Sequence, residues 1–121
     1  MTKKAFYLGT CSTCSRIMKD LNLDGFEMRE IKSQAISEAE VEEMKALAGS
    51  FEELFSRRSM KYRAWGLHEK ELGEQDYKAL IMREYTFLKR PVFIVENQIF
   101  VGNTKKVVEE ATAVINGGLT D

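Results

Sequence analysis

Residues 5–16 read Ala-Phe-Tyr-Leu-Gly-Thr-Cys-Ser-Thr-Cys-Ser-Arg, a short apolar run followed by a glycine and two cysteines. An apolar run of this length that ends at a glycine is typical of a buried strand. After the cysteines, Ile17, Met18 and Leu21 recur at helical spacing, so an amphipathic helix follows the strand. Because Thr and Ser favour the N-cap of a helix, Cys11 is predicted at or just before the N-terminus of that helix.

A helix N-terminus changes the chemistry of a thiol that is placed there. The unpaired backbone N–H groups and the helix dipole stabilise an anion, including a thiolate. They lower the pKa of the thiol, which makes it nucleophilic near neutral pH. The same N–H groups can hold an oxyanion such as phosphate, sulfate or arsenate. The sequence therefore predicts a reactive thiol at Cys11.

The chain has two cysteines in all, Cys11 and Cys14, and their spacing limits what they can do. A disulfide-stapled secreted domain needs several bridges that close long loops, so this pair is no stability framework. A structural zinc site needs four ligands, whereas the chain offers these two cysteines and one histidine, His68; no metal site is expected. A C-x-x-C pair is typical of a redox motif. The alternative is two small side chains buried in the core.

Length and charge exclude several classes of function. The 121 residues predict a single domain over residues 1–121. The 18 basic and 19 acidic side chains give a net charge of −1, without the basic surface that binds a phosphate backbone, so no direct nucleic-acid partner is expected. No apolar run approaches the ~18 residues that span a bilayer, and no signal peptide begins the chain. We expect a cytoplasmic protein without a membrane partner.

The middle of the chain predicts one more strand and then helices. Residues 26–31 alternate apolar and polar side chains, as in a half-buried strand, which completes a strand–helix–strand unit with parallel pairing. Ser37 and Glu40 form the pattern of a capping box. Residues 37–85 carry helical spacing throughout and predict an all-helical block.

The last third predicts a hairpin and a helix. Residues 91–102 contain two apolar runs separated by Glu96-Asn97, which indicates a two-residue turn in which Asn97 tolerates a positive φ. A helix capped by Asn103 or Thr104 follows, and residues 117–118, both glycine, end it.

Pro91, the single proline, opens this hairpin. An ordinary trans proline is permitted at the first residue of a strand. The order of elements, with C-x-x-C after the first strand, nevertheless resembles the thioredoxin fold, an α/β fold with a mixed sheet and helices on both faces. In that superfamily the proline before the hairpin is cis and lies against the redox cysteine. The resemblance implies that Pro91 is a structural cis-proline of the site.

Three motifs narrow the resemblance. They are Thr-Cys-Ser-Thr-Cys at residues 10–14, Leu-Phe-Ser-Arg-Arg-Ser at residues 54–59, and Leu-Lys-Arg-Pro-Val at residues 88–92. In this order and spacing they are similar to the arsenate reductase ArsC / Spx family, over about residues 4 to 116. That family has a thioredoxin-like core with a helical block inserted before the late hairpin, where residues 37–85 lie in this chain.

The resemblance implies a role for each matching residue. Cys11 matches the nucleophilic cysteine that attacks an oxyanion or a disulfide. Arg58 matches the arginine after the middle helix, and Arg90 matches the arginine before the cis-proline. Two guanidiniums near one thiol lower its pKa and hold an oxyanion through forked hydrogen bonds. The alternative for the basic run at residues 57–63 is a solvated helix face.

Two departures from the family pattern bear on the reaction. Glutathione-coupled arsenate reductases of the family carry an arginine just after the second hairpin strand, whereas residues 100–104 contain none. They also have one cysteine in the first motif, to which this chain adds Cys14. Cys14 can resolve a mixed disulfide or a sulfenic acid on Cys11.

The resemblance thus implies a cytosolic thiol-disulfide oxidoreductase similar to arsenate reductases that are coupled to glutaredoxin, thioredoxin or glutathione. Cys11 is the expected nucleophile and Cys14 the resolving thiol, with Arg58 and Arg90 stabilising the oxyanion or thiolate. The substrate would be a small oxyanion or a protein disulfide. No tightly bound cofactor is expected, and glutathione can serve as co-substrate.

A second interpretation comes from the Spx branch of the family. Spx-type regulators also carry C-x-x-C and bind RNA polymerase through its α subunit. Cys11 and Cys14 would then form a redox-active disulfide that senses oxidation rather than catalysing turnover. A third interpretation is a pocket that binds an anion without turnover.

Overall fold

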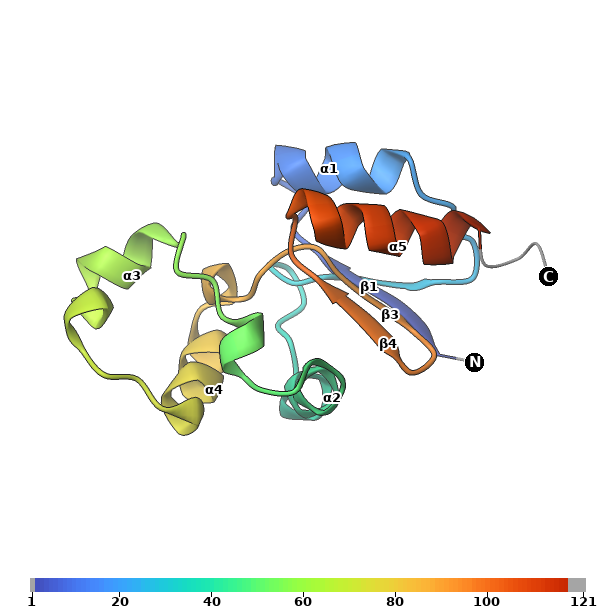
Figure 1. Ribbon diagram of the computed structural model, residues 1–121. Coiled ribbons are helices and arrows are strands. Elements are labelled where there is room, and N and C mark those ends of the chain that lie inside the picture. Colours follow the sequence, from blue (N-terminus) through green and yellow to red (C-terminus); the bar gives the residue numbers. More distant parts are fainter. Residues whose placement is uncertain (1, 118–121) are drawn as a thin grey trace. The chain divides into compact units, whose positions relative to one another are not determined.

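The computed structural model describes residues 2–117 of the chain (Figure 1). The residues group into two compact units, Met1–Gln34 with Arg90–Asp121, and Ala35–Lys89. The first unit is discontinuous in sequence, because the chain leaves it after Gln34 and returns at Arg90. Within the described residues no helix is both long enough and apolar enough to cross a membrane.

The first unit is built on a four-stranded mixed sheet. Its strands are β1 (Lys3–Tyr7), β2 (Glu27–Glu30), β3 (Val92–Val95) and β4 (Gln98–Val101), in the spatial order β2-β1-β3-β4. β1 pairs with β2 in parallel and with β3 antiparallel, and β3 pairs antiparallel with β4. The predicted parallel strand–helix–strand unit and the late hairpin are both confirmed.

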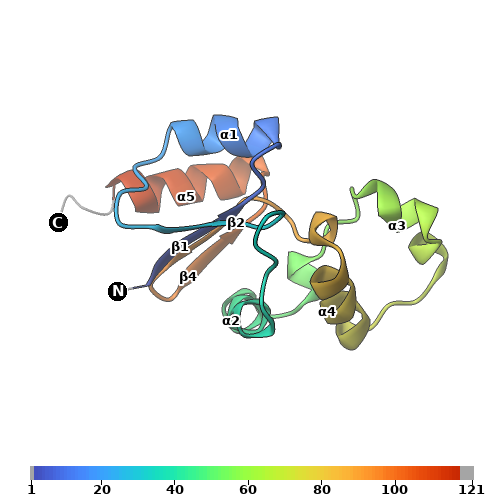
Figure 2. The same ribbon diagram turned by 180° about the vertical axis from the view of Figure 1, so that it is seen from behind.

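Two helices pack side by side against one face of this sheet, α1 (Ser12–Lys19) and α5 (Lys105–Gly117), as both views show (Figures 1 and 2). Their apolar faces meet the sheet in one buried cluster: Ala5, Ile17, Leu21, Phe93, Ala111 and Ile115. Side chains on the opposite side of the strands are buried as well, namely Phe6, Val92 and Ile94. Since successive residues of a strand face opposite sides, both faces of β1 and β3 are apolar.

The turn of the hairpin differs from the expectation in one detail. Glu96, rather than Asn97, has the positive φ, at 55°, and it is the only non-glycine residue among residues 2–117 that does. The left-handed conformation therefore lies at the first turn residue. At the start of α5 the cap is Thr104, whose Oγ1 accepts the N–H of Val107 at 3.3 Å. Gly117 is still helical, and Gly118 lies outside the described residues.

The second unit contains short helices. They are α2 (Glu38–Ala48), η1 (Glu52–Leu54), α3 (Met60–Ala64), η2 (Leu67–Glu69), α4 (Glu74–Arg83) and η3 (Tyr85–Phe87), where η marks a 3₁₀ turn. The predicted capping box is confirmed: Ser37 Oγ accepts the N–H of Glu40, and the Glu40 side chain accepts the N–H of Ser37. Gly49 ends α2 in the left-handed region at φ 104°, where a residue without Cβ is least strained.

Aromatic side chains form the core of this unit. Phe55 is fully buried; its ring stacks on Phe87 at 5.1 Å between centroids and lies 4.8 Å from the ring of Tyr77. An isolated antiparallel bridge joins Phe55, just after η1, to Leu88, near the end of the unit. The block predicted for residues 37–85 is therefore helical, as expected, and lies within the unit Ala35–Lys89. The predicted class, α/β with a mixed sheet flanked by helices and an inserted helical block, is confirmed.

Candidate active site

Cys11 is the N-cap residue of α1, as the sequence predicted. Its backbone is extended, with φ −88° and ψ 112°, and its carbonyl accepts the N–H of Ser15 at 3.1 Å. Its own N–H donates to the carbonyl of Leu8 at 3.0 Å, which closes a four-residue turn between β1 and α1. The short turn after a paired strand thus places the thiol at the first turn of the helix.

The sulfur of Cys11 takes the place of the oxygen in an ordinary N-cap. The backbone N–H of Cys14 donates to Sγ of Cys11, with 3.4 Å between nitrogen and sulfur. Partial burial is the largest single effect on this thiol and raises its pKa. The hydrogen bonds from the backbone and side chain of Cys14 and from the backbone of Thr13, together with the charge of Arg90, outweigh burial and lower the pKa of Cys11.

Cys14 has the opposite character. Its side chain is fully buried on the inner face of α1. Burial, followed by the interactions with the neighbouring Cys11 thiol, raises the pKa of Cys14 to about 11. Both cysteines are free thiols in this structure. The pair is therefore asymmetric, with one half-exposed sulfur stabilised as thiolate and one buried sulfur kept protonated.

Arg90 and Pro91 belong to the same unit as the cysteines. The peptide bond between Arg90 and Pro91 is cis, the isomer that the resemblance to the thioredoxin fold implies. Pro91 is fully buried, and its carbonyl accepts the N–H of Gly102 at 2.9 Å, which extends the β3–β4 pairing by one step. The charge of Arg90 lowers the pKa of both cysteines, so its guanidinium is electrostatically coupled to the two thiols.

Glu30 is a residue of this site that the sequence did not single out. It ends β2, and its Oε2 accepts the N–H of Gly9, in the turn that carries Cys11, at 2.7 Å. The Glu30 carboxylate accepts several hydrogen bonds. The one from Gly9 has the largest effect and those from Ser33 come next, and together they lower the pKa of the Glu30 carboxyl to about 2. No local motif marks such a residue, since its partner lies 21 positions away in the sequence.

Arg58 belongs to the second unit, and its role at the thiol stays a prediction. It is exposed in the turn between η1 and α3, where its N–H donates to Ser56 Oγ at 3.3 Å. The neighbouring Arg57 is engaged within the same unit, with Glu52 at 3.0 Å and the hydroxyl of Tyr77 at 2.9 Å. Within the basic run at residues 57–63, Arg57 therefore has two structural partners, Glu52 and Tyr77.

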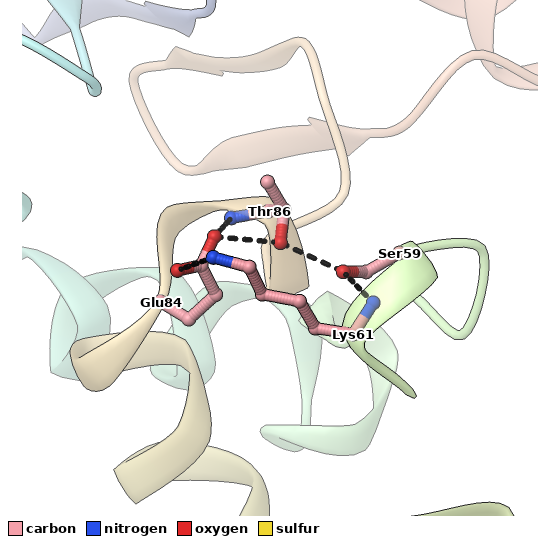
Figure 3. Close-up of polar contacts among 4 residues, drawn as sticks. All are labelled: Ser59, Lys61, Glu84 and Thr86. Carbon is pink, nitrogen blue, oxygen red and sulfur yellow. Dashed lines mark hydrogen bonds and ion pairs between the residues drawn. The ribbon is translucent and has the colours of Figure 1, made fainter. Parts of the chain in front are cut away.

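A hydrogen-bonded chain joins Ser59, the residue after Arg58, to Lys61, Glu84 and Thr86 (Figure 3). Thr86 Oγ1 donates to Glu84 Oε2 at 2.8 Å. Because that donation uses the only hydroxyl proton of Thr86, the 2.7 Å contact between Ser59 Oγ and Thr86 Oγ1 has Ser59 as donor. Ser59 Oγ in turn accepts the N–H of Lys61, and Lys61 Nζ pairs with Glu84 Oε1 at 2.8 Å. The chain ties the start of α3 to the end of α4.

Among the described residues no group of three His, Cys, Asp or Glu side chains lies close enough to hold a metal ion. His68 is exposed, with its Nε2 3.6 Å from a carboxylate oxygen of Glu69.

A thiol at the N-cap of the first helix, a C-x-x-C pair and a cis-proline before the hairpin define a thioredoxin-like protein with a thiol site. The chain matches the ArsC family over residues 6–111, which is most of its length, and it belongs to that family.

Solved structures with the same fold carry related descriptions. A protein described as ArsC-family related, from Bacteroides fragilis, is 23% identical, with a TM-score of 0.75 over 91% of this chain and 97% of that one. An arsenate reductase from Vibrio cholerae is 16% identical, with a TM-score of 0.71 over 95% and 98% of the two chains. An arsenate reductase (ArsC) related protein from Brucella melitensis is 16% identical, with a TM-score of 0.68 over 91% and 93%. At these identities the likeness is one of fold. A search of curated proteins finds no significant match.

Proposed function

We propose that the protein is a thiol oxidoreductase of the ArsC type, with Cys11 as nucleophile and Cys14 as resolving thiol. The observation that carries the proposal is the asymmetry of the pair. The sulfur of Cys11 accepts a backbone N–H at 3.4 Å and its pKa is lowered, whereas the pKa of Cys14 is raised to about 11. Membership of the ArsC family supports the same class of chemistry.

With a disulfide as substrate, the reaction takes two thiol–disulfide exchanges. The Cys11 thiolate attacks one sulfur of the substrate, which forms a mixed disulfide and releases the other sulfur as a thiolate. Cys14 then loses its proton and attacks Sγ of Cys11, which releases the second substrate thiol and leaves a Cys11–Cys14 disulfide. Two electrons have passed to the substrate. An external dithiol such as glutaredoxin or thioredoxin, or two molecules of glutathione, returns them.

With arsenate as substrate, the thiolate of Cys11 attacks the arsenic atom; as the S–As bond forms, one As–O bond breaks and its oxygen takes a proton from solvent and leaves as water. Cys14 then attacks Sγ of Cys11; the S–As bond breaks, its electron pair stays on arsenic, and arsenite is released. Arg90 would hold the oxyanion, and we assign Arg58 to the same task because it matches the family motif. Guanidinium groups suit this role, since their forked donors match an oxyanion.

The decisive assay follows NADPH consumption by the reduced protein with arsenate and either a glutathione–glutaredoxin or a thioredoxin system. A small mixed disulfide of glutathione serves as the second substrate. We expect turnover with at least one substrate in one coupling system, and none for Cys11→Ser. If neither substrate is turned over in either system, the enzyme proposal is wrong.

A second candidate function is redox sensing in the manner of Spx, with RNA polymerase as partner through its α subunit. The absence of an arginine from residues 100–104, together with the second cysteine, favours it over a pure arsenate reductase. A pull-down of the α subunit with the oxidised and the reduced protein separates the two functions. Binding that changes with oxidation supports the regulator, and no binding in either state removes it.

A further inference from the structure

The carboxylate of Glu30 joins two loops of the first unit. Its Oε2 accepts the N–H of Gly9 at 2.7 Å. Its Oε1 accepts three donors from the loop after β2: the N–H of Lys32 at 3.0 Å, the N–H of Ser33 at 2.7 Å and the hydroxyl of Ser33 at 2.8 Å. A single carboxylate therefore holds the loop before α1 to the loop after β2.

The pairing of β1 with β2 holds the backbone of Glu30 in place. Glu30 stands opposite Tyr7 in the parallel register of β1 and β2, and the N–H of Ile31 donates to the carbonyl of Tyr7 at 2.9 Å. The backbone of Glu30 is thus anchored to the strand that leads directly into the turn before α1. A side chain on an anchored backbone orders its partner rather than moving with it.

The partner of Oε2 is the turn that places the thiol. Gly9 is the second residue of the Leu8–Cys11 turn, which the N–H of Cys11 closes on the carbonyl of Leu8 at 3.0 Å. A carboxylate that accepts the N–H of Gly9 fixes the first peptide of this turn, between Leu8 and Gly9. The position of Gly9 is also close to the carboxylate, since a Cβ there would lie 3.4 Å from Oε2. The turn and the carboxylate therefore fit against each other.

We propose that Glu30 is a positioning residue, whose carboxylate holds the Leu8–Cys11 turn so that the Cys11 sulfur stays aligned with the N–H groups of the first turn of α1. The proposal rests on the proposed function of Cys11 as the nucleophile. Glu30 does not touch the substrate; it acts through the backbone of Gly9.

The direction in which the pKa of Cys11 changes when Glu30 is replaced separates a positioning role from a simple charge effect. Removing a negative charge near a thiol favours the thiolate, so charge loss alone lowers the pKa of Cys11. Releasing the turn weakens the hydrogen bonds that stabilise the thiolate, so loss of positioning raises it. A role confined to stability changes the unfolding midpoint and leaves the pKa of Cys11 where it is.

The experiment measures the rate of alkylation by iodoacetamide against pH for the full chain, in wild type, Glu30→Gln, Glu30→Ala and the control Glu27→Gln. Glu27 lies exposed on the same strand, and its substitution removes the same charge. The single acceptor oxygen of the Gln amide should face the three donors that Oε1 accepts, which leaves its NH2 group against the N–H of Gly9; Gln is therefore expected to release the Gly9 turn, and Ala to release both loops. Because the high pKa of Cys14 keeps it protonated at neutral pH, the rate there reports Cys11.

We expect Glu30→Ala to slow alkylation at neutral pH about three- to ten-fold, the effect of about one hydrogen bond to the thiolate. Glu30→Gln should lie between Ala and wild type, and Glu27→Gln should match wild type. An unchanged or a faster rate in Glu30→Gln overturns the positioning role while the function proposed for Cys11 stands. A wild-type Cys11 that titrates at or above the ordinary ~8.5 of a free cysteine overturns both proposals. Circular dichroism checks that each variant is folded. If Glu30→Ala does not fold, the alkylation rate of Glu30→Gln still tests the positioning role.

Discussion

The backbone N–H of Cys14 donates to the sulfur of Cys11, so that Cys14 stabilises the Cys11 thiolate through its main chain while burial raises the pKa of its own thiol to about 11. The i, i+3 spacing of C-x-x-C makes this possible, because the fourth residue of a capped helix offers its N–H to the side chain of the N-cap. This hydrogen bond helps to lower the pKa of Cys11, whereas burial is the main reason that the pKa of Cys14 is raised.

The two thiols should differ in reactivity at neutral pH. Cys11 is half-exposed with a lowered pKa, and Cys14 is buried with a pKa of about 11, so a limiting amount of iodoacetamide should modify Cys11 first. Peptide mass spectrometry after partial alkylation measures the ratio. Modification should shift toward Cys14 only as the pH rises toward 11. Equal labelling of both cysteines at neutral pH would contradict the asymmetry.

Cys14→Ser should trap the reaction at its first step. The variant keeps the backbone N–H that stabilises Cys11 but has no thiol with which to resolve a mixed disulfide. After exposure to oxidised glutathione, we expect a stable adduct of one glutathione per chain in the intact mass. Wild type under the same conditions should lose two hydrogens instead, as the Cys11–Cys14 disulfide forms. Cys11→Ser is the control and should show neither product.

Removing the charge of Arg90 should make Cys11 less acidic. The guanidinium lowers the pKa of this thiol, so Arg90→Gln should raise it and slow alkylation at neutral pH by about three- to ten-fold. A pH profile of the alkylation rate measures the change. Lys106→Gln removes an exposed cation from the first turn of α5 and serves as the matched control. If Arg90→Gln and Lys106→Gln gave the same pH profile of the alkylation rate, Arg90 would have no specific effect on the pKa of Cys11.

The chain through Ser59, Thr86 and Glu84 should contribute to the stability of the fold. Thr86→Val keeps the shape of the side chain but leaves the carboxylate of Glu84 and the hydroxyl of Ser59 without this partner. We expect a loss of about 1 to 3 kcal/mol in the free energy of unfolding, measured by urea titration. Thr112→Val, which removes a single bond to a helix carbonyl, is the control and should cost less. Equal losses would mean that the chain adds nothing beyond one hydrogen bond.

Glu30 should make the stability of the fold depend on pH in the acid range, with wild type losing in acid a contribution that Glu30→Gln never has. Its pKa is about 2 in the folded protein, against ~4.3 for an ordinary glutamate, so its contribution to stability is complete above the ordinary value and is lost as the pH falls through about 2. Wild type and Glu30→Gln should therefore differ most in urea midpoint above about pH 5. The difference should shrink as the pH is lowered toward 2. A difference that stays constant with pH would exclude the carboxylate as its source.

Local signals account for what could be predicted from the sequence. The N-cap position of Cys11 and the capping box of Ser37 and Glu40 depend on residues a few positions apart, and both are confirmed. The contact of Glu30 with Gly9 joins residues 21 positions apart, and that of Ser59 with Thr86 joins residues 27 apart. Neither contact leaves a periodic pattern, because each depends on how strands and helices pack. Likewise, the positive φ at Glu96 reflects the hairpin and not a residue preference.

The discontinuity of the first unit has a consequence for the newly made chain. Cys11 leaves the ribosome long before Arg90 and before β3, the strand that pairs with β1 on the side away from β2. At 8 residues, α1 is too short to be stable in water by itself, since isolated helices below about 12 residues are marginal. We therefore expect the pKa of Cys11 to fall below its ordinary value only after residues 92–117 have been translated and have packed, so that both cysteines of the nascent chain are thiols of ordinary reactivity.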